Sequence, residues 1–469
     1  MPIALLPLIY DVMVSVDAES RGSMFKKGSL FGFILLGLSH LWLFELTPWA
    51  PTTGIALLWI AYSLFLSLFY GAGFYLFSVI YTKKLRWLIF PLIWVLIEWI
   101  RAYGPLANTV SSLGYSQVLN QGLLQWASIV GVFGISFILV LFSCIIVECL
   151  IGKRRLIWTA VLIFTTVLCT SFSYYIFFFD PPTSTGSIKT LSIQPNYEQQ
   201  FKMNPNNFDQ IRLDLIMQTR IHEIRETELI LWPEIITSSL NISNSTFRKN
   251  LDILVLNKKR HLIFGTPFYE KGSYFNAAVA FPHYSTKESV YKKTKLMPFG
   301  EYWPFRRVFN LLNLKNLVPG ADYTPGNTPT ILNANAAKIG MAICLESIYP
   351  QHFVQSVNKG ANLLVTIANN AWFFDSSASK KLLQMTILRA VEQQRSVIQC
   401  ANTGYSAIIS PNGTVLNKIP ATTKGFMQNS VSLYSKRSFY TKYSLVLPLL
   451  SICILGLLFL LGLRNKIRK

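Results

Sequence analysis

The most informative part of the polar half of the chain is Ile339-Gly340-Met341-Ala342-Ile343-Cys344-Leu345-Glu346-Ser347. Its apolar run predicts a buried strand, and the polar residues after Cys344 indicate a helix that begins near Ser347. A cysteine in such a place is usually a small core residue. This stretch alone therefore predicts a strand-to-helix junction and does not establish any chemistry.

Similar apolar runs alternate with helical stretches on both sides of this junction. The runs that predict strands are Lys189–Gln194, Glu228–Pro233, His261–Pro267, Ala277–Pro282, Lys338–Cys344, Asn362–Ile367 and Ser396–Ala401. Helix-period stretches lie near 207–226, 245–257, 347–358 and 379–395. This alternation predicts a layered α/β domain over residues 181–441, and about 260 residues are enough for one buried core.

The rest of the chain has the composition of a membrane protein. Of the 469 residues, 51% are hydrophobic and only 14% are charged, whereas soluble domains average about 25% charged residues. Each of six segments has about the 20 apolar residues that cross a bilayer: 28–47, 54–81, 86–103, 124–149, 156–179 and 443–463. We therefore expect a polytopic protein with a transmembrane domain (1–180), an inserted α/β domain (181–441), and a last membrane helix with a basic tail (442–469).

The net charge of +21 indicates membrane orientation rather than nucleic-acid binding. Basic residues cluster at Lys26-Lys27, Lys83–Arg86, Lys153–Arg155 and 464–469, and the loops between these clusters are poor in lysine and arginine. Basic loops stay in the cytoplasm. The pattern therefore predicts that residues 181–441 lie on the opposite side, which in a bacterium is the periplasm.

Cysteine and histidine usage excludes two common kinds of site. Most of the six cysteines lie in apolar stretches, which does not fit a disulfide framework. The five histidines form no ligand-spaced pair, so we expect no metal. The chain has neither a phosphate-binding loop nor a dinucleotide fingerprint, so we expect no cofactor. His352 follows Cys344 by eight residues, and we expect it to be a surface histidine rather than a catalytic partner.

Two charged residues fall in or beside a predicted membrane helix. Glu98 and Arg101 are three residues apart, which is the spacing of neighbours on one helix face. Charges inside a bilayer are costly and usually paired. We expect these two residues to pair with each other.

Three polar features remain that could carry chemistry. Trp232-Pro233-Glu234 ends an apolar run, a lysine-rich loop runs from Tyr291 to Glu301, and Cys344 ends a strand. Each feature has a common structural role, as a helix cap, a solvated face or a core residue. The combination is more informative than any single feature.

Glutamate, lysine and cysteine in this order and context resemble the nitrilase (carbon-nitrogen hydrolase) superfamily. The chain is most similar to the apolipoprotein N-acyltransferases, membrane enzymes that add the third acyl chain to bacterial lipoproteins. The motifs that carry the resemblance are Glu98-Trp99-Ile100-Arg101, Gly114-Tyr115-Ser116-Gln117, Gln194-Pro195-Asn196, Trp232-Pro233-Glu234, Gly265-Thr266-Pro267, Pro298-Phe299-Gly300-Glu301-Tyr302, Ile343-Cys344, Asn370-Ala371-Trp372-Phe373, Arg389-Ala390-Val391-Glu392 and Asn402-Thr403-Gly404.

The resemblance implies a fold and a set of site residues. The fold is a nitrilase-type αββα sandwich inserted between the transmembrane helices of a polytopic protein. Glu234, Lys293 and Cys344 match the catalytic glutamate, lysine and nucleophile, and Glu301 and Glu346 match supporting glutamates. Among the loop lysines, Lys293 fits because it lies two residues after Tyr291 and eight before Glu301.

These residue types suit acyl transfer in two steps. The thiol of Cys344 can attack an ester and hold the acyl group as a thioester. Lys293 can stabilise the oxyanion, and Glu234 can move the protons. The helix that begins near Ser347 is expected to favour the thiolate.

The resemblance also implies the substrates and the location. The donor is a phospholipid, namely phosphatidylethanolamine, and the acceptor is the α-amine of the diacylglyceryl cysteine of an apolipoprotein. We expect a monomer in the bacterial inner membrane that binds no nucleic acid, with its catalytic domain in the periplasm. Met1–Val16 is similar to the end of the family's second membrane helix, which leaves six crossings where the family has eight.

Two alternatives stay open from the sequence. The first is a membrane-bound amidase or amide synthase with the same three residues and another substrate. The second is a low-activity paralogue that binds lipoproteins without modifying them. The second is motivated by departures from the family pattern, which include Met203, Leu345, Asn370 and Phe374.

Overall fold

The computed structural model describes residues 2–151, 155–179, 183–236, 245–255, 260–282, 289–311, 322–373 and 375–467. The chain divides into two compact units. The helical unit comprises Met1–Pro181 and Lys442–Lys469, and the α/β unit comprises Pro182–Thr441. Phe374 lies outside the described residues.

The helical unit has a helix in each segment that was predicted to cross a membrane. Its elements are α1 (Pro2–Ser15), α2 (Arg21–Ser39), η1 (Leu41–Leu46), α3 (Thr52–Ile80), α4 (Arg86–Ile100), η2 (Leu113–Gln117), α5 (Gln121–Gln125), α6 (Ala127–Ile151), α7 (Arg155–Phe179) and α15 (Val446–Ile467). Among the described residues, α3 and α6 are long and apolar enough to cross a membrane. Shorter apolar segments lie in α1, α7 and α15, and the six-crossing topology stays a prediction.

Helices α2 and α3 pack closely because glycines line their contact. A Cβ atom added at Gly28 would lie 2.6 Å from the backbone oxygen of Tyr70, and one added at Gly32 would lie 2.9 Å from the Cβ of Tyr70. Small residues at i and i+4 let two helix backbones approach in an apolar environment, where packing drives association. The spacing of Gly28 and Gly32 therefore sets how closely α2 and α3 can pack.

The expected pair of Glu98 and Arg101 does not form. Arg101 donates to the hydroxyl of Tyr70 (2.9 Å) and to that of Ser111 (2.7 Å). Glu98 accepts from the indole N–H of Trp94 (2.9 Å) and from the backbone N–H of Leu113 (2.8 Å). The prediction was wrong because neighbouring segments supply polar groups that hold each charge separately.

The α/β unit contains two six-stranded sheets in its described residues. In the first sheet the strand order is β12-β1-β2-β3-β4-β5, and in the second it is β11-β10-β9-β8-β7-β6. The strands are β1 (Gly186–Gln194), β2 (Leu229–Leu231), β3 (His261–Glu270), β4 (Ser273–Pro282), β5 (Ser289–Lys292), β6 (Ile331–Ala334), β7 (Ala337–Ile343), β8 (Leu363–Ala368), β9 (Val397–Ala401), β10 (Ser406–Ile409), β11 (Val415–Ile419) and β12 (Gly425–Leu433).

The two sheets have the same plan, with parallel strands in the centre and antiparallel strands outside. In the first sheet β1, β2 and β3 are parallel, and in the second β7, β8 and β9 are parallel. Strands β8 and β9 are buried along their whole length. This fits parallel strands that are covered on both faces.

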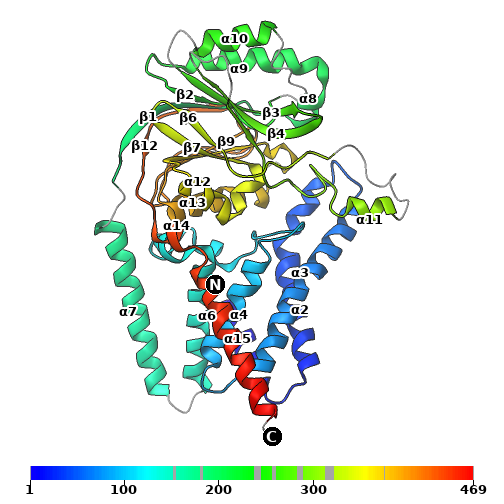
Figure 1. Cartoon of the computed structure of the whole chain (residues 1–469), viewed down its shortest axis with the longest axis vertical. Coiled ribbons are helices and arrows are strands. Elements are labelled where there is room, and N and C mark those ends of the chain that lie inside the picture. Colours follow the sequence, from blue (N-terminus) through cyan, green and yellow to red (C-terminus); the bar gives the residue numbers. More distant parts are fainter. Residues whose placement is uncertain are drawn as a thin grey trace. The chain divides into compact units, whose positions relative to one another are not determined.

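Two helical layers complete the sandwich. Figure 1 shows α9 (Phe208–His222) and α10 (Ser245–Val255) over the first sheet, and α12 (Pro350–Asn358) and α13 (Ser377–Gln393) over the second. One apolar core, which includes Leu231, Met341 and Val365, lies between the sheets, and another fills the space under α9 and α10. The predicted αββα arrangement is therefore confirmed.

Short helical segments complete the chain in this region. They are α8 (Gln199–Met203), η3 (Pro205–Asn207), α11 (Arg306–Leu311), η6 (Cys344–Ile348), η7 (Asn370–Trp372) and α14 (Phe439–Tyr443). Among them, η6 follows β7 directly, and η7 begins two residues after the end of β8. These two segments lie at the strand ends where the candidate site is found.

The packing of α2 against α3 predicts that a glycine-to-alanine substitution changes the stability of the protein differently at Gly28 and at Gly54. Gly28→Ala should destabilise the chain by about 1–3 kcal/mol, because its Cβ meets backbone that cannot move freely. Gly54→Ala should be neutral or stabilise α3, since a Cβ there has nothing within 4 Å and alanine is the better helix former. Thermal unfolding of the two variants in detergent measures the difference. Equal unfolding temperatures would contradict the close packing.

Candidate active site

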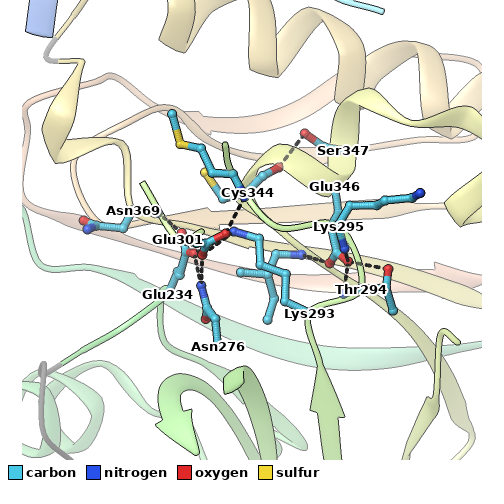
Figure 2. Close-up of polar contacts among 12 residues, drawn as sticks. Glu234, Asn276, Lys293, Thr294, Lys295, Glu301, Cys344, Glu346, Ser347 and Asn369 are labelled. Atoms are coloured by element: carbon cyan, nitrogen blue, oxygen red, sulfur yellow. Dashed lines mark hydrogen bonds and ion pairs between the residues drawn. The ribbon is translucent and has the colours of Figure 1, made fainter. Parts of the chain in front are cut away.

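The predicted site residues meet because each follows the end of a strand. Glu234 comes three residues after β2, Lys293 follows β5 directly, and Cys344 follows β7 directly. Strands β2 and β7 belong to different sheets, so the two sheets present their strand ends to one place. Figure 2 shows the side chains of Glu234, Lys293, Glu301 and Cys344 gathered there.

A buried ammonium between two carboxylates forms the centre of the site. The Nζ of Lys293 lies 2.8 Å from a carboxylate oxygen of Glu301 and 3.3 Å from one of Glu234. Lys293 is 1% exposed and Glu234 is 4% exposed. Burial alone lowers the pKa of Lys293, but the charges of Glu234 and Glu301 outweigh burial and hold this pKa above its ordinary value. Lys293 is therefore a permanent cation.

Asn276, in β4, joins the two carboxylates and was not found from the sequence. Its amide nitrogen donates to Glu234 (2.8 Å) and to Glu301 (2.5 Å). The amide thus bridges the same two oxygens as the Lys293 ammonium and fixes the distance between the acids. A buried asparagine in a strand gives no sequence pattern of its own. In the β4–β5 register Ala277 lies opposite Lys292, and the backbone N–H of Lys293 donates to the carbonyl of Asn276 (2.8 Å), which puts Asn276 beside Lys293.

Cys344 stands on a turn that aims its side chain out of the sheet. Its φ of +50° lies in the left-handed region, which non-glycine residues rarely adopt. The hydroxyl of Ser347 donates to the carbonyl of Cys344 (2.9 Å) and holds the turn. Backbone strain of this kind costs about 1–3 kcal/mol and is concentrated at functional sites.

The surroundings of the Cys344 thiol disfavour its ionisation. Burial raises the pKa of the thiol, and the charges of Glu234 and Glu301 raise it further, against the opposing effect of Lys293. The helix that was expected to begin near Ser347 and to favour the thiolate begins instead at Pro350, and the residues after Cys344 form the short η6 turn.

Glu346 does not touch this charge cluster but connects the segments that carry it. One of its carboxylate oxygens accepts from the backbone N–H groups of Thr294 (2.6 Å) and Lys295 (3.0 Å). The other accepts from the hydroxyl of Tyr291 (2.6 Å) and the backbone N–H of Ile343 (2.8 Å). Glu346 thereby ties the loop of Lys293 to the turn of Cys344.

The second carboxylate oxygen of Glu234 accepts a hydrogen bond from the backbone just after β8. The backbone N–H of Asn369, directly after β8, donates to it at 2.8 Å. The side chain of Asn369 donates in turn to Gln199 of α8 (3.0 Å). Three segments of the chain, at Asn276, Lys293 and Asn369, therefore orient one carboxylate.

Three further sequence expectations have clear outcomes. His352 is buried, with its ring Nε2 2.7 Å from the carbonyl of Met341, so the prediction of a surface histidine was wrong. Lys292 points away and pairs with Glu270 at the surface. Among the departures from the family pattern, Met203 is exposed and Asn370 is fully buried.

The three groups have the chemistry that acyl transfer through a thiol requires. A thiol such as that of Cys344 can act as a nucleophile, and a carboxylate such as that of Glu234 can accept its proton. The Lys293 ammonium lies beside Glu234 and can stabilise negative charge. An ammonium has three donors. Two of those of Lys293 are directed at carboxylates within the described residues, which leaves one for a developing oxyanion.

Solved structures with a similar fold belong to the nitrilase superfamily. Nit3 of Saccharomyces cerevisiae is 15% identical with a TM-score of 0.40, and the match covers 56% of this chain and 95% of Nit3. An amidase from Nesterenkonia sp. is 16% identical with a TM-score of 0.40, and the match covers 56% of this chain and 94% of the amidase.

Several curated relatives are named apolipoprotein N-acyltransferase. The relative from Geobacter metallireducens is 28% identical over 84% of this chain and 77% of its own length. The relative from Rickettsia prowazekii is 29% identical over 75% of this chain and 71% of its own length. The relative from Haemophilus ducreyi is 32% identical over 66% of this chain and 65% of its own length.

Two family patterns match consecutive parts of the chain. Residues 1–145 match the apolipoprotein N-acyltransferase N-terminal domain, and residues 194–439 match the carbon-nitrogen hydrolase family. The second match covers more than half of the chain and includes every residue of the charge cluster. The chain belongs to the carbon-nitrogen hydrolase family, in the branch that carries an apolipoprotein N-acyltransferase N-terminal domain.

Proposed function

We propose that this chain is an acyltransferase that moves a fatty acyl chain from a phospholipid to the α-amine of the diacylglyceryl cysteine of an apolipoprotein. The observation that carries the proposal is the buried cluster of Glu234, Lys293 and Cys344 in a chain whose apolar helices match the N-terminal domain of this family. Phosphatidylethanolamine is the proposed donor. Both substrates are lipids or lipid-anchored, which accounts for a hydrolase-like fold joined to membrane helices.

The first half-reaction acylates the enzyme. Glu234 takes the proton of the Cys344 thiol, and the sulfur attacks the ester carbonyl of the phospholipid. The ammonium of Lys293 and the backbone N–H of Leu345 stabilise the oxyanion. When the C–O bond breaks, the lysophospholipid alkoxide takes the proton from Glu234, and the acyl group stays on Cys344 as a thioester.

The second half-reaction transfers the acyl group to nitrogen. The neutral α-amine attacks the thioester carbonyl, and Glu234 accepts a proton from that nitrogen. The C–S bond breaks, an amide forms, and the sulfur regains the proton from Glu234. The proton shuttles between sulfur and carboxylate within a cluster of two carboxylates and one ammonium. Its net charge of one minus is therefore conserved, which suits a buried site.

Glu301 and Glu346 have supporting roles in this proposal. Glu301 holds the Lys293 ammonium beside Glu234 and is itself held by the backbone N–H of Met297 (2.7 Å). Glu346 fixes the Cys344 turn against the loop of Lys293. Neither carboxylate needs to exchange a proton with the substrates.

The proposed location follows from the charge pattern and the family. Relatives of this name indicate a bacterial membrane protein. We place residues 1–180 and 442–469 in the inner membrane and residues 181–441 in the periplasm, because the basic segments outside 181–441 fit the cytoplasmic side. The chain acts as a monomer, since one copy carries the whole charge cluster.

The nucleophile is tested by two cysteine substitutions. Cys344→Ala should abolish acylation, because no other group can form the thioester. Cys400→Ala should retain activity, since Cys400 is also buried but lies in the apolar core, where its thiol donates to backbone carbonyls of β1 and β2. Intact-protein mass spectrometry after incubation with phosphatidylethanolamine alone should show one added acyl chain in the control and none in Cys344→Ala.

The same measurement separates the alternatives. An amidase of another substrate would gain no acyl mass from a phospholipid. A binding paralogue would gain none either, and would also leave a diacylated lipopeptide acceptor unmodified while retaining it. Turnover by Cys344→Ala would remove the assignment of the nucleophile.

The role of Lys293 is tested against its neighbours. Lys293→Ala should slow acylation by about 10²-fold or more, which is the usual loss when an oxyanion donor is removed. Lys292→Ala should change the rate little, because Lys292 pairs with Glu270 at the surface. Initial rates with a fluorescent phospholipid measure both variants. A larger loss in Lys292→Ala would show that the loop is assigned wrongly.

Glu234→Gln should separate thiol ionisation from catalysis. The Glu234 charge raises the pKa of Cys344, so removing it should lower this pKa and speed the alkylation of Cys344 by iodoacetamide between pH 7 and 9. Acylation by phospholipid should nevertheless fall, because the proton acceptor is lost. Mass spectrometry of the Cys344 peptide follows both reactions. Slower alkylation together with unchanged acylation would contradict the role of Glu234 as the base.

A further inference from the structure

The main chain at Glu234 has an unusual conformation. Ile235, the next residue, has a φ of +44°, which is strongly disfavoured for a β-branched side chain. Such a conformation costs about 1–3 kcal/mol and persists only where its surroundings impose it. The contacts around this turn therefore decide where the Glu234 carboxylate stands.

Two hydrogen bonds to Gly265 of β3 hold the turn on either side of Glu234. The N–H of Gly265 donates to the carbonyl of Pro233 (3.0 Å), and the N–H of Ile236 donates to the carbonyl of Gly265 (3.1 Å). A Cβ added at Gly265 would lie 2.5 Å from the Cα of Glu234, so the two backbones are in close contact. The carbonyl of Glu234 itself takes no part in these two hydrogen bonds with β3.

The Glu234 carbonyl is met by a buried lysine that the reaction steps above do not use. The Nζ of Lys202, in α8, lies 3.4 Å from this oxygen. Lys202 is 3% exposed, and no carboxylate of the described residues lies within ion-pair distance of its ammonium. Burial lowers the pKa of Lys202 to about 7, and the nearby charge of Glu234 offsets only part of this effect.

Burying a lysine without a paired carboxylate lowers the stability of the folded state, because the amine loses its hydration. A methionine would fill the same space without this desolvation penalty, so the stability of the fold does not explain a lysine here. Helix α8 also acts on the carboxylate of Glu234, through Asn369. The side chain of Gln199 accepts a hydrogen bond from the side chain of Asn369, and the backbone N–H of Asn369 donates to the carboxylate. One short helix therefore contacts the Glu234 carbonyl directly and its carboxylate through one intervening residue.

We propose that Lys202 is a positioning residue for the general base: its terminal amine, which can donate in either protonation state, holds the Glu234 carbonyl and the strained turn at Ile235, so that the carboxylate faces Cys344. This inference rests on the proposed function, because it assigns Lys202 a role in forming the acyl-enzyme. Lys202 acts through Glu234 and does not contact the reacting atoms.

The test compares three substitutions in the full-length protein in nanodiscs that contain phosphatidylethanolamine, without acceptor. Lys202→Met removes the donor and keeps the volume, Lys202→Arg keeps a charged donor, and Lys424→Met removes an exposed lysine that pairs with Asp214. The rate of acyl gain on Cys344 is followed by rapid quenching and mass spectrometry at several donor concentrations. The unfolding temperature of each variant is measured in parallel.

We expect Lys202→Met to lower the maximal acylation rate by about tenfold or more, which is typical when a catalytic group is displaced. The donor concentration for half-maximal rate should stay within about twofold, and the unfolding temperature should not fall, because a buried charge has been removed. Lys202→Arg should recover part of the rate, and Lys424→Met should match the wild type.

The outcomes distinguish the two proposals. If the wild type acylates and Lys202→Met acylates equally fast, the role of Lys202 is wrong and the proposed function stands. If the rate falls only together with the unfolding temperature, Lys202 is merely structural and the inference is also wrong. If the wild type gains no acyl mass, the proposed function itself fails. Should Lys202→Met not fold, Lys202→Leu supplies the same comparison with another apolar side chain.

Discussion

The site depends on one constraint, a buried ammonium that must remain charged between two carboxylates. Lys293 could not be buried alone, because desolvation would remove its proton. Glu234 and Glu301 prevent this, and Asn276 keeps the two acids from separating. Burial, together with the same two acids, raises the pKa of the neighbouring Cys344 thiol. In the proposed mechanism the cluster therefore holds a neutral thiol beside the carboxylate that would take its proton.

The fold brings these groups together by using the ends of strands from two sheets. The charged residues come from loops after β2 and β5 in one sheet and from the turn after β7 in the other. The shared apolar core between the sheets, with Leu231 and Met341, fixes how far apart these ends stand. Glu346 then adds a polar connection across the same gap, through the backbone of Thr294 and Ile343. Packing sets the distance between the loops, and hydrogen bonds set their orientation.

Much of this arrangement could be predicted from the sequence. The buried parallel strands β7, β8 and β9 are apolar along their length and were found, and so were helices α9, α10, α12 and α13. The outer strands were missed, because β11 is half exposed and β5 and β6 are only four residues long. Lys293 was separated from Lys292 by a family pattern, and the opposite directions of the two side chains agree with that choice.

What could not be predicted depends on contacts between distant segments. Asn276 and Lys202 carry no local pattern, since their importance comes only from lying against Glu234. His352 looked like a surface residue because its helix is short and polar, yet the carbonyl of Met341 holds it inside. Glu98 and Arg101 have the spacing of a pair, but Leu113 and Tyr70, from other segments, hydrogen-bond to them instead. Sequence spacing predicts which side chains can contact each other along one helix. It does not reveal the polar groups of distant segments that bind the same side chains in the folded protein.

The raised pKa of the Cys344 thiol has a consequence for chemical durability. Peroxides and disulfides react with thiolates far faster than with thiols. A buried thiol with a raised pKa presents little thiolate to such oxidants. The surroundings that would make Cys344 dependent on a base in the proposed mechanism therefore also slow its conversion to sulfenic acid or a mixed disulfide.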